Sequence, residues 1–176
     1  VYPLNNKLFT DSPFTVKKLS GKGGAFLVIS VDKGDVFCRE KFSEDQKMFE
    51  QAAFDFAQNK IKPQYKDLNK MNKDLSVQLF KEVGELGFLG IDIPEEFGGI
   101  DLDKTAACIV LDALSSGKSA SFMVTLSAHT GIGTLPIVWY GTDEQKQKYL
   151  PKIASGEYLA CYALTEPNAG SDALAG

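Results

Sequence analysis

The sequence is poor in the residues that build disulfide frameworks and metal sites. Among its 176 residues are three cysteines and one histidine, His129. Cys38, Cys108 and Cys161 are far apart, odd in number and form no CxxC pair. This argues against a disulfide framework or a zinc site and favours a reducing compartment. We expect the three thiols to be small buried side chains. A histidine-rich metal site is excluded.

Long apolar runs and a surplus of positive charge are also lacking. No segment approaches the ~20 apolar residues of a membrane span. The opening VYPLNNKLFTDSPF lacks the basic-then-apolar order of a signal peptide. A net charge of −4 gives no general attraction to nucleic acid or to anionic membranes. With 44% hydrophobic and 24% charged residues, the composition is typical of one globular domain.

Helical signals begin at Ser43, after an extension over residues 1–42 in which Ala25–Ile29 could form a short strand. Ser43 and Gln46 have the spacing of a capping box. Pro63 ends or kinks the first helix, and a short second segment follows toward residue 71. Helical spacing places one set of apolar residues on a single face of the first helix. They are Met48, Phe49, Ala52, Ala53 and Phe56.

A further helix is predicted from about Asp74 to Leu86, with Gly87 as its C-terminal cap. The loop that follows, GFLGIDIPEEFGGIDLD, is dense in Gly and Pro and is expected to be fixed by packing. Asp103 then caps a helix over residues 104–116. The next segment starts at Ser119 or Ser121 and runs to about residue 140. It is apolar on most faces, which predicts burial between other helices.

A second capping box, Thr142 with Gln145, opens a last helix that ends near Gly156, with Pro151 marking a break. The β-prone stretch Tyr158–Leu164 follows. A single strand is not stable alone, so it pairs either with Ala25–Ile29 or with strands beyond residue 176. The predicted fold class is mainly α, a run of helices followed by the start of a β-domain.

Few side chains have the pattern of a catalytic group. His129, in an apolar helix, is best interpreted as a packed and hydrogen-bonded core residue. No GxSxG elbow supports a nucleophilic triad, and GKGG lacks the ending of a phosphate-binding Walker loop. The adjacent Glu95 and Glu96 are interpreted as caps or solvated charges.

The stretch ALTEPNAGSD, residues 163–172, differs from the rest because it is a polar turn around Pro167 and Gly170. Thr165, Ser171 and nearby backbone N–H groups could present several donors to an anionic or carbonyl-rich ligand. Gly170 would allow the backbone to approach that ligand closely. A plain turn with an Asx cap would use the same residue types, so both interpretations remain open.

The stretch CYALTEPNAGSD resembles the signature of the acyl-CoA dehydrogenase flavoproteins. GFLGIDIPEEFGG is similar to the family's loop between N-terminal helices, and GTDEQKQKYLPKIASGE to its segment before the signature. SAHTGIG and the N-terminal extension resemble the very-long-chain branch. The resemblance covers residues 37–176. It implies an N-terminal helical domain over residues 43–157 and the start of a middle β-domain over 158–176, after the 1–42 extension.

What the resemblance implies is flavin-dependent α,β-dehydrogenation of a fatty acyl-CoA to a trans-2-enoyl-CoA, as in fatty-acid β-oxidation. FAD would take the β hydride and an electron-transfer flavoprotein would reoxidise it, in a dimer or tetramer. By motif position, Tyr162, Leu164 and Thr165 would border the flavin ring. Gly170 and Ser171 would face the pyrophosphate, with Ser171 also near the acyl-CoA. Glu166 and Asp172 would be structural.

The helix holding Ser127, His129, Gly131 and Gly133 would line the acyl tail, and its small residues would favour a longer chain. The family's general base, a glutamate, lies downstream in a C-terminal domain that these 176 residues do not include. We therefore expect no dehydrogenase activity from this chain alone. The alternatives are an acyl-CoA oxidase of the same fold and a non-catalytic helical assembly module. The expected location is the bacterial cytoplasm, with the mitochondrial matrix as the alternative.

Overall fold

The computed structural model describes residues 38–173. Residues up to Glu44 belong to one unit and those from Asp45 onward to another, and each unit is described by itself. In the first unit the structure describes a short 3-10 turn, Arg39–Lys41. The strand predicted at Ala25–Ile29 lies outside the described residues.

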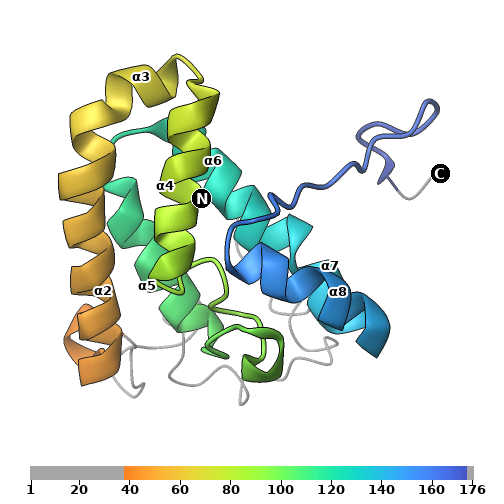
Figure 1. The fold of residues 1–176 in the computed structure, drawn as a ribbon, viewed down its shortest axis with the longest axis horizontal. Helices are drawn as coiled ribbons and strands as arrows, with labels where there is room; N and C mark the ends of the chain where they lie inside the picture. Colours follow the sequence, from red (N-terminus) through yellow and green to blue (C-terminus); the bar gives the residue numbers. More distant parts are fainter. Residues whose placement is uncertain (1–37, 174–176) are drawn as a thin grey trace, which may run out of the picture. The chain divides into compact units, whose positions relative to one another are not determined.

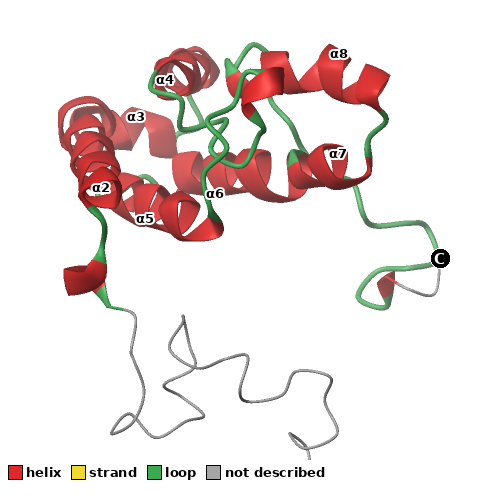
Figure 2. Cartoon of the chain, turned by 90° about the horizontal axis from the view of Figure 1, so that it is seen from below, coloured by secondary structure: helices red, strands yellow, loops and turns green. Residues whose placement is uncertain are grey.

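The second unit consists of helices joined by loops, and none of its described residues forms a strand (Figure 2). Helices α3 and α6 pack together, α5 contacts α6, and α7 lies against α8 (Figure 1). The predicted mainly α fold class is confirmed. The helices are α2 (Glu44–Phe56), α3 (Tyr65–Asn69), α4 (Lys73–Glu85), α5 (Lys104–Ser115), α6 (Ala120–Ala128), α7 (Leu135–Tyr140) and α8 (Asp143–Ala154).

Two apolar clusters hold the second unit together. The larger one joins α2 to α6 and includes the loop after α4, where Phe88, Leu89 and Ile91 are buried. The smaller one joins α8 to the same loop through Ile93 and Phe97. The loop is thus fixed by packing, as its mixture of Gly, Pro and apolar residues predicts.

Local capping signals fix the ends of several helices. Asp103 Oδ1 accepts a hydrogen bond from Ala106 N at 2.9 Å, and Thr142 and Gln145 form the predicted capping box at α8. Gly87 and Gly156 follow α4 and α8 in the left-handed region, with φ of 78° and 75°. These conformations suit glycine and satisfy carbonyl groups at the helix ends.

The cap of α5 provides a direct test of this local contribution. Replacing Asp103 by alanine removes the acceptor for Ala106 N and is expected to lower the free energy of unfolding by about 1 kcal/mol. Asp103→Asn keeps an oxygen acceptor and should retain nearly all of the stability. Urea unfolding followed by circular dichroism measures both variants. Equal losses in the two variants would contradict the role of the cap.

Two predicted helix breaks take a different form. After α2 the chain continues through a π turn, Ala57–Ile61, and a 3-10 turn, Lys62–Gln64. Pro63 lies in the first turn of that 3-10 segment, where a backbone donor is not needed. Pro151 lies inside α8, which continues to Ala154, so the break predicted there is wrong. Proline lacks the N–H for one helical hydrogen bond, and α8 tolerates this loss in its last turns.

The prediction that residues 119–140 are buried on most faces is wrong. The segment is divided into α6, a π turn over His129–Gly133, and α7. Phe122, Leu126 and His129 are buried, whereas Val124, Ile132 and Trp139 are more than half exposed. The neighbouring elements in the described part of the chain therefore cover only some of the apolar side chains of this segment.

The same segment has the length and composition of a membrane span, although no such segment was expected from the sequence. Ala120–Tyr140 is helical over 21 residues with a mean hydropathy of 1.2, enough to cross a membrane by length and composition alone. A core helix of a globular protein passes the same test. Here the buried side of the segment packs on α3, α5 and the end of α8.

Other side chains predicted to be buried are exposed. Met48 and Ala52 of α2 face solvent, and the buried face of that helix is formed by Phe49, Ala53 and Phe56. All three cysteines are free and exposed, which contradicts the prediction that they are buried. A thiol is small enough to be tolerated in the core or at the surface, so its burial cannot be derived from residue type.

Candidate functional site

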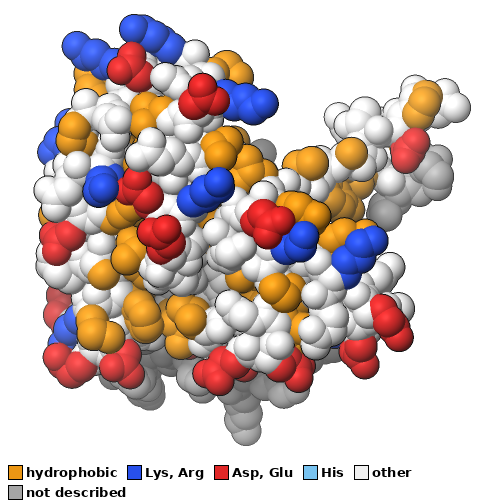
Figure 3. Space-filling view, viewed as in Figure 1, with side chains coloured by type: hydrophobic (Ala, Val, Ile, Leu, Met, Phe, Trp, Pro, Cys, Tyr) orange, Lys and Arg blue, Asp and Glu red, His pale blue; other side chains and the backbone are white. Residues whose placement is uncertain are grey.

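The terminal segment, defined here as residues 158–172, carries most of the predicted site residues. It leaves the end of α8 and extends away from the helices (Figure 1). Hydrophobic side chains are visible along it (Figure 3). Tyr162 and Leu164 are 51% and 52% exposed, and Thr165, Gly170 and Ser171 are also exposed. The segment is extended, but it has no strand partner in the described part of the chain.

A backbone-closed turn lies inside the terminal segment. Glu166 N donates to Ala169 O at 3.0 Å, and Ala169 N donates to Glu166 O at 3.2 Å. Pro167 occupies the second position, which its fixed φ suits. No Asx hydrogen bond from Asn168 occurs among the described residues, so backbone groups close the turn.

The turn leaves several donors without a protein partner. Within the described residues, the hydroxyls of Thr165 and Ser171 and the backbone N–H groups of Thr165, Gly170 and Ser171 make no hydrogen bond. A Cβ added to Gly170 would meet no atom within 4 Å. The backbone here is therefore open to an approaching ligand. These donors and the apolar side chains of Tyr162 and Leu164 suit a ligand with a flat ring and acceptor oxygens.

His129 connects the helices to the start of the terminal segment. Its side chain is 0% exposed, its Nδ1 lies 3.0 Å from Ala160 N, and its Nε2 lies 3.2 Å from Ile153 O. Because Ala160 N–H can only donate, Nδ1 is the acceptor and the proton resides on Nε2, which donates to Ile153 O. The predicted packed and hydrogen-bonded core histidine is confirmed.

Burial lowers the pKa of His129 below its ordinary value of 6.5, and the hydrogen bond to Ile153 opposes that shift. The imidazole is accordingly neutral at neutral pH. This protonation state is the one that leaves Nδ1 free to accept from Ala160.

Gly133 provides the space in which the terminal segment crosses the helices. A Cβ at this position would lie 2.8 Å from the carbonyl carbon and the Cβ of Ala160 and 3.0 Å from Cys161 N. These distances are too short for any side chain. Gly133 and His129 therefore pack beneath the segment. The expectation that the helix holding them lines an acyl tail stays a prediction.

Ser127 and Gly131 remain accessible. Ser127 is exposed, and a Cβ added to Gly131 would find no atom within 4 Å. The Ser127 hydroxyl makes no hydrogen bond to the terminal segment in the described structure. The arrangement therefore brings His129 and Gly133 to the segment and leaves Ser127 and Gly131 on an open surface of the same helical run.

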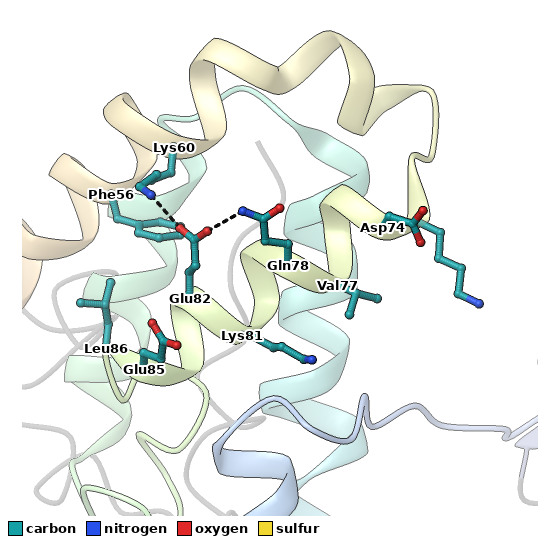
Figure 4. Close-up of a pocket in the computed structure, with 10 residues that line it drawn as sticks. Phe56, Lys60, Asp74, Val77, Gln78, Lys81, Glu82, Glu85 and Leu86 are labelled. Atoms are coloured by element: carbon teal, nitrogen blue, oxygen red, sulfur yellow. Dashed lines mark hydrogen bonds and ion pairs between the residues drawn. The ribbon is translucent and has the colours of Figure 1, made fainter.

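A separate hollow of about 910 Å³ lies between α2 and α4 (Figure 4). Glu82 points into it, accepts from Gln78 Nε2 at 2.9 Å and pairs with Lys60 at 3.0 Å. These hydrogen bonds lower the pKa of Glu82. The hollow contains none of the predicted site residues, and its walls mix charges of both signs. No cluster of three or more His, Cys, Asp or Glu side chains suited to a metal occurs in the described part of the chain.

Comparisons with known proteins indicate one family. Residues 43–157 match the model of the acyl-CoA dehydrogenase N-terminal domain. The chain is 44% identical over 153 residues to a probable acyl-CoA dehydrogenase of Bacillus subtilis. This alignment covers 87% of the chain and 25% of the relative. The chain is 40% identical over 134 residues to a mitochondrial isovaleryl-CoA dehydrogenase of Solanum tuberosum, covering 76% and 32%.

The fold also matches a solved structure. The crystal structure of an acyl-CoA dehydrogenase from Bacillus anthracis complexed with FAD aligns with a TM-score of 0.77 and 50% sequence identity. The alignment covers 88% of this chain and 26% of that one. The chain thus spans about a quarter to a third of the length of the relatives that it matches.

Proposed function

The chain belongs to the acyl-CoA dehydrogenase family, and we propose that it forms the N-terminal part of an FAD-dependent enzyme that oxidises a fatty acyl-CoA to a trans-2-enoyl-CoA. The observation that carries this proposal is the set of unpartnered donors at Thr165, Gly170 and Ser171, placed beside the exposed Tyr162 and Leu164. The family match over the adjacent helices supports it.

The terminal segment would form one side of the FAD site. Tyr162 and Leu164 would lie against the flavin ring and exclude water, and the hydroxyl of Thr165 would donate to an acceptor on the ring. The N–H groups of Gly170 and Ser171 would face the pyrophosphate, where the lack of a side chain on Gly170 permits close approach. A flavin held by these residues would supply the acceptor for the hydride that leaves the β carbon of the substrate.

The acyl chain would be bound by the open surface of the helical run, with Ser127 and Gly131 as contacts and Ser171 near the thioester end. The open position at Gly131 leaves room for an acyl chain, and the resemblance of SAHTGIG to the very-long-chain branch supports a long one. A relative acts on isovaleryl-CoA, a short branched substrate, so chain length needs a direct test.

Other parts of the enzyme would complete the reaction. In this proposal the proton-abstracting glutamate and the remaining FAD contacts come from parts of the enzyme other than residues 1–176. A partner subunit would complete a dimer or tetramer. Electrons would pass to an electron-transfer flavoprotein in the bacterial cytoplasm, or in a mitochondrial matrix if the source is eukaryotic. Residues 158–176 would begin the middle β-domain, and residues 1–42 would be an extension of the helical domain.

The first test uses the full-length protein purified with FAD. We expect a flavin absorption spectrum that is bleached by an acyl-CoA under anaerobic conditions and restored by an electron-transfer flavoprotein. Rapid reoxidation by oxygen during turnover would identify an acyl-CoA oxidase. A colourless protein that neither retains nor binds FAD would contradict the proposal and favour a non-catalytic helical module.

Gly131→Phe tests the acyl surface. The Cβ of a new side chain here would meet no protein atom within 4 Å, so folding should be retained while the kcat/KM for a sixteen-carbon substrate falls at least about tenfold relative to a four-carbon one. Gly131→Ala is the matched control and should change this ratio little. A wild-type enzyme with a strict short-chain preference, or an unchanged ratio in Gly131→Phe, would contradict the assignment.

A further inference from the structure

We propose that His129 is a positioning residue for the FAD site, because its imidazole fixes the register of the terminal segment through Ala160. The inference rests on the proposed function of that segment. His129 itself points into the protein core, contacts no proposed ligand and would act through the backbone of Ala160.

The hydrogen bond between Ala160 and His129 can determine which side chains face the ligand, because side chains alternate along an extended chain. Side chains alternate between two sides, so Ala160, Tyr162 and Leu164 share one side and Cys161 and Ala163 the other, up to Thr165, after which the turn begins. A slip by one residue would exchange the two sides. The hydrogen bond from Ala160 N to His129 Nδ1 lies at the point where the segment leaves the helices. It therefore selects which side chains would face the flavin.

The contacts around Ala160 make this position specific. Its side chain packs against the smaller apolar cluster of α8. Its backbone lies over Gly133, where a Cβ would approach within 2.8 Å. His129 and Gly133 are the two ends of the π turn, and both contact the segment at Ala160.

Both nitrogens of His129 have a defined task. Nδ1 accepts from Ala160, and Nε2–H donates to Ile153 O in the last turn of α8. The ring also contacts Phe80 edge-on, with centroids 5.5 Å apart. The His129 side chain thus joins the end of α8 to the segment that follows it. A substitution can remove either of its two hydrogen bonds and leave the other in place.

Two substitutions separate these tasks. His129→Asn retains an acceptor at the position of Nδ1 and removes the donor to Ile153. His129→Gln retains a donor near the position of Nε2 and removes the acceptor for Ala160. Both variants lose one buried hydrogen bond, so similar decreases in melting temperature are expected.

Only the loss of the Nδ1 acceptor should affect the cofactor site. In the full-length protein, we expect His129→Gln to raise the Kd for FAD about tenfold or more and to shift the flavin absorption band, and His129→Asn to stay near wild type. Without FAD, hydrogen exchange at the Ala160 amide should speed up in His129→Gln and remain slow in His129→Asn.

The outcomes distinguish this inference from the proposed function. If the wild-type protein binds FAD but the two variants weaken binding equally, or neither weakens it, His129 is only structural and the inference is wrong. Unchanged protection of Ala160 in His129→Gln would overturn it as well. A wild-type protein that does not bind FAD would overturn the proposed function and, with it, this inference.

Discussion

Replacing Phe80 by alanine is expected to lower the free energy of unfolding by about 3–5 kcal/mol. The side chain is 0% exposed and lies where α4 meets α6, with its ring 5.2 Å from that of Phe122 and 5.5 Å from that of His129. Its removal loses the transfer free energy of a large ring and leaves a cavity that rigid helices cannot close. Urea unfolding followed by circular dichroism measures the change.

Phe54→Ala is the matched control for this prediction. Phe54 lies on the same type of helix, in α2, but is 43% exposed and outside both apolar clusters. Its truncation should change the free energy of unfolding by about 0.5 kcal/mol or less. A comparable loss in the two variants would mean that Phe80 is not at the centre of the packing.

Gly99→Ala is expected to cost about 3 kcal/mol or more, because overpacking here meets backbone atoms. A Cβ would lie 1.9 Å from the carbonyl oxygen of Ile93 and 2.4 Å from its carbonyl carbon. The loop cannot yield easily, since Asp101 N donates to Ile93 O at 3.0 Å and Ile100 N donates to Gly90 O at 3.0 Å. A shift that relieves the collision would break these bonds.

Gly131→Ala serves as the control for Gly99. The added methyl group meets no atom within 4 Å, and the residue lies in a helical turn. Replacing glycine there should stabilise the fold by roughly 0.5–1 kcal/mol. The two variants have the same chemical change and opposite expected signs. Thermal unfolding measures the melting temperature of both variants. A Gly99→Ala variant that melts at the wild-type temperature would contradict the predicted collision with Ile93.

Sequence patterns predicted the features that depend on neighbouring residues. The cap by Asp103 and the capping box at Thr142 require a side chain to reach only the next turn, so spacing is sufficient to find them. The end of α8 at Gly156 can be predicted in the same way, because the left-handed conformation at a helix end favours glycine. The cap of α4, where Asn72 accepts from Leu75 N, had the same local signal and was missed.

Burial was harder to predict because it depends on contacts between distant segments. Val124 and Leu126 are both apolar, yet Val124 is 70% exposed and Leu126 is 1% exposed. Both residues lie in the regular helix α6, on different faces, and only the packing of other elements decides which face is covered. Beyond α6, the π turn over His129–Gly133 shifts the faces of the helical run, which a regular period of 3.6 residues does not anticipate. Ala160 was also missed, because its contribution comes from a backbone N–H that every residue except proline carries.

The extended form of residues 158–165 has a consequence for the solubility of this polypeptide. The backbone N–H and C=O groups of residues 161–165 make no hydrogen bond in the described structure and form an open edge, and Tyr158, Tyr162 and Leu164 add exposed apolar surface. Such an edge is a template for pairing with another chain. Preparations of residues 1–176 alone should therefore self-associate through β-structure, and a strand that covers this edge within a longer protein would act as an intramolecular protection against aggregation.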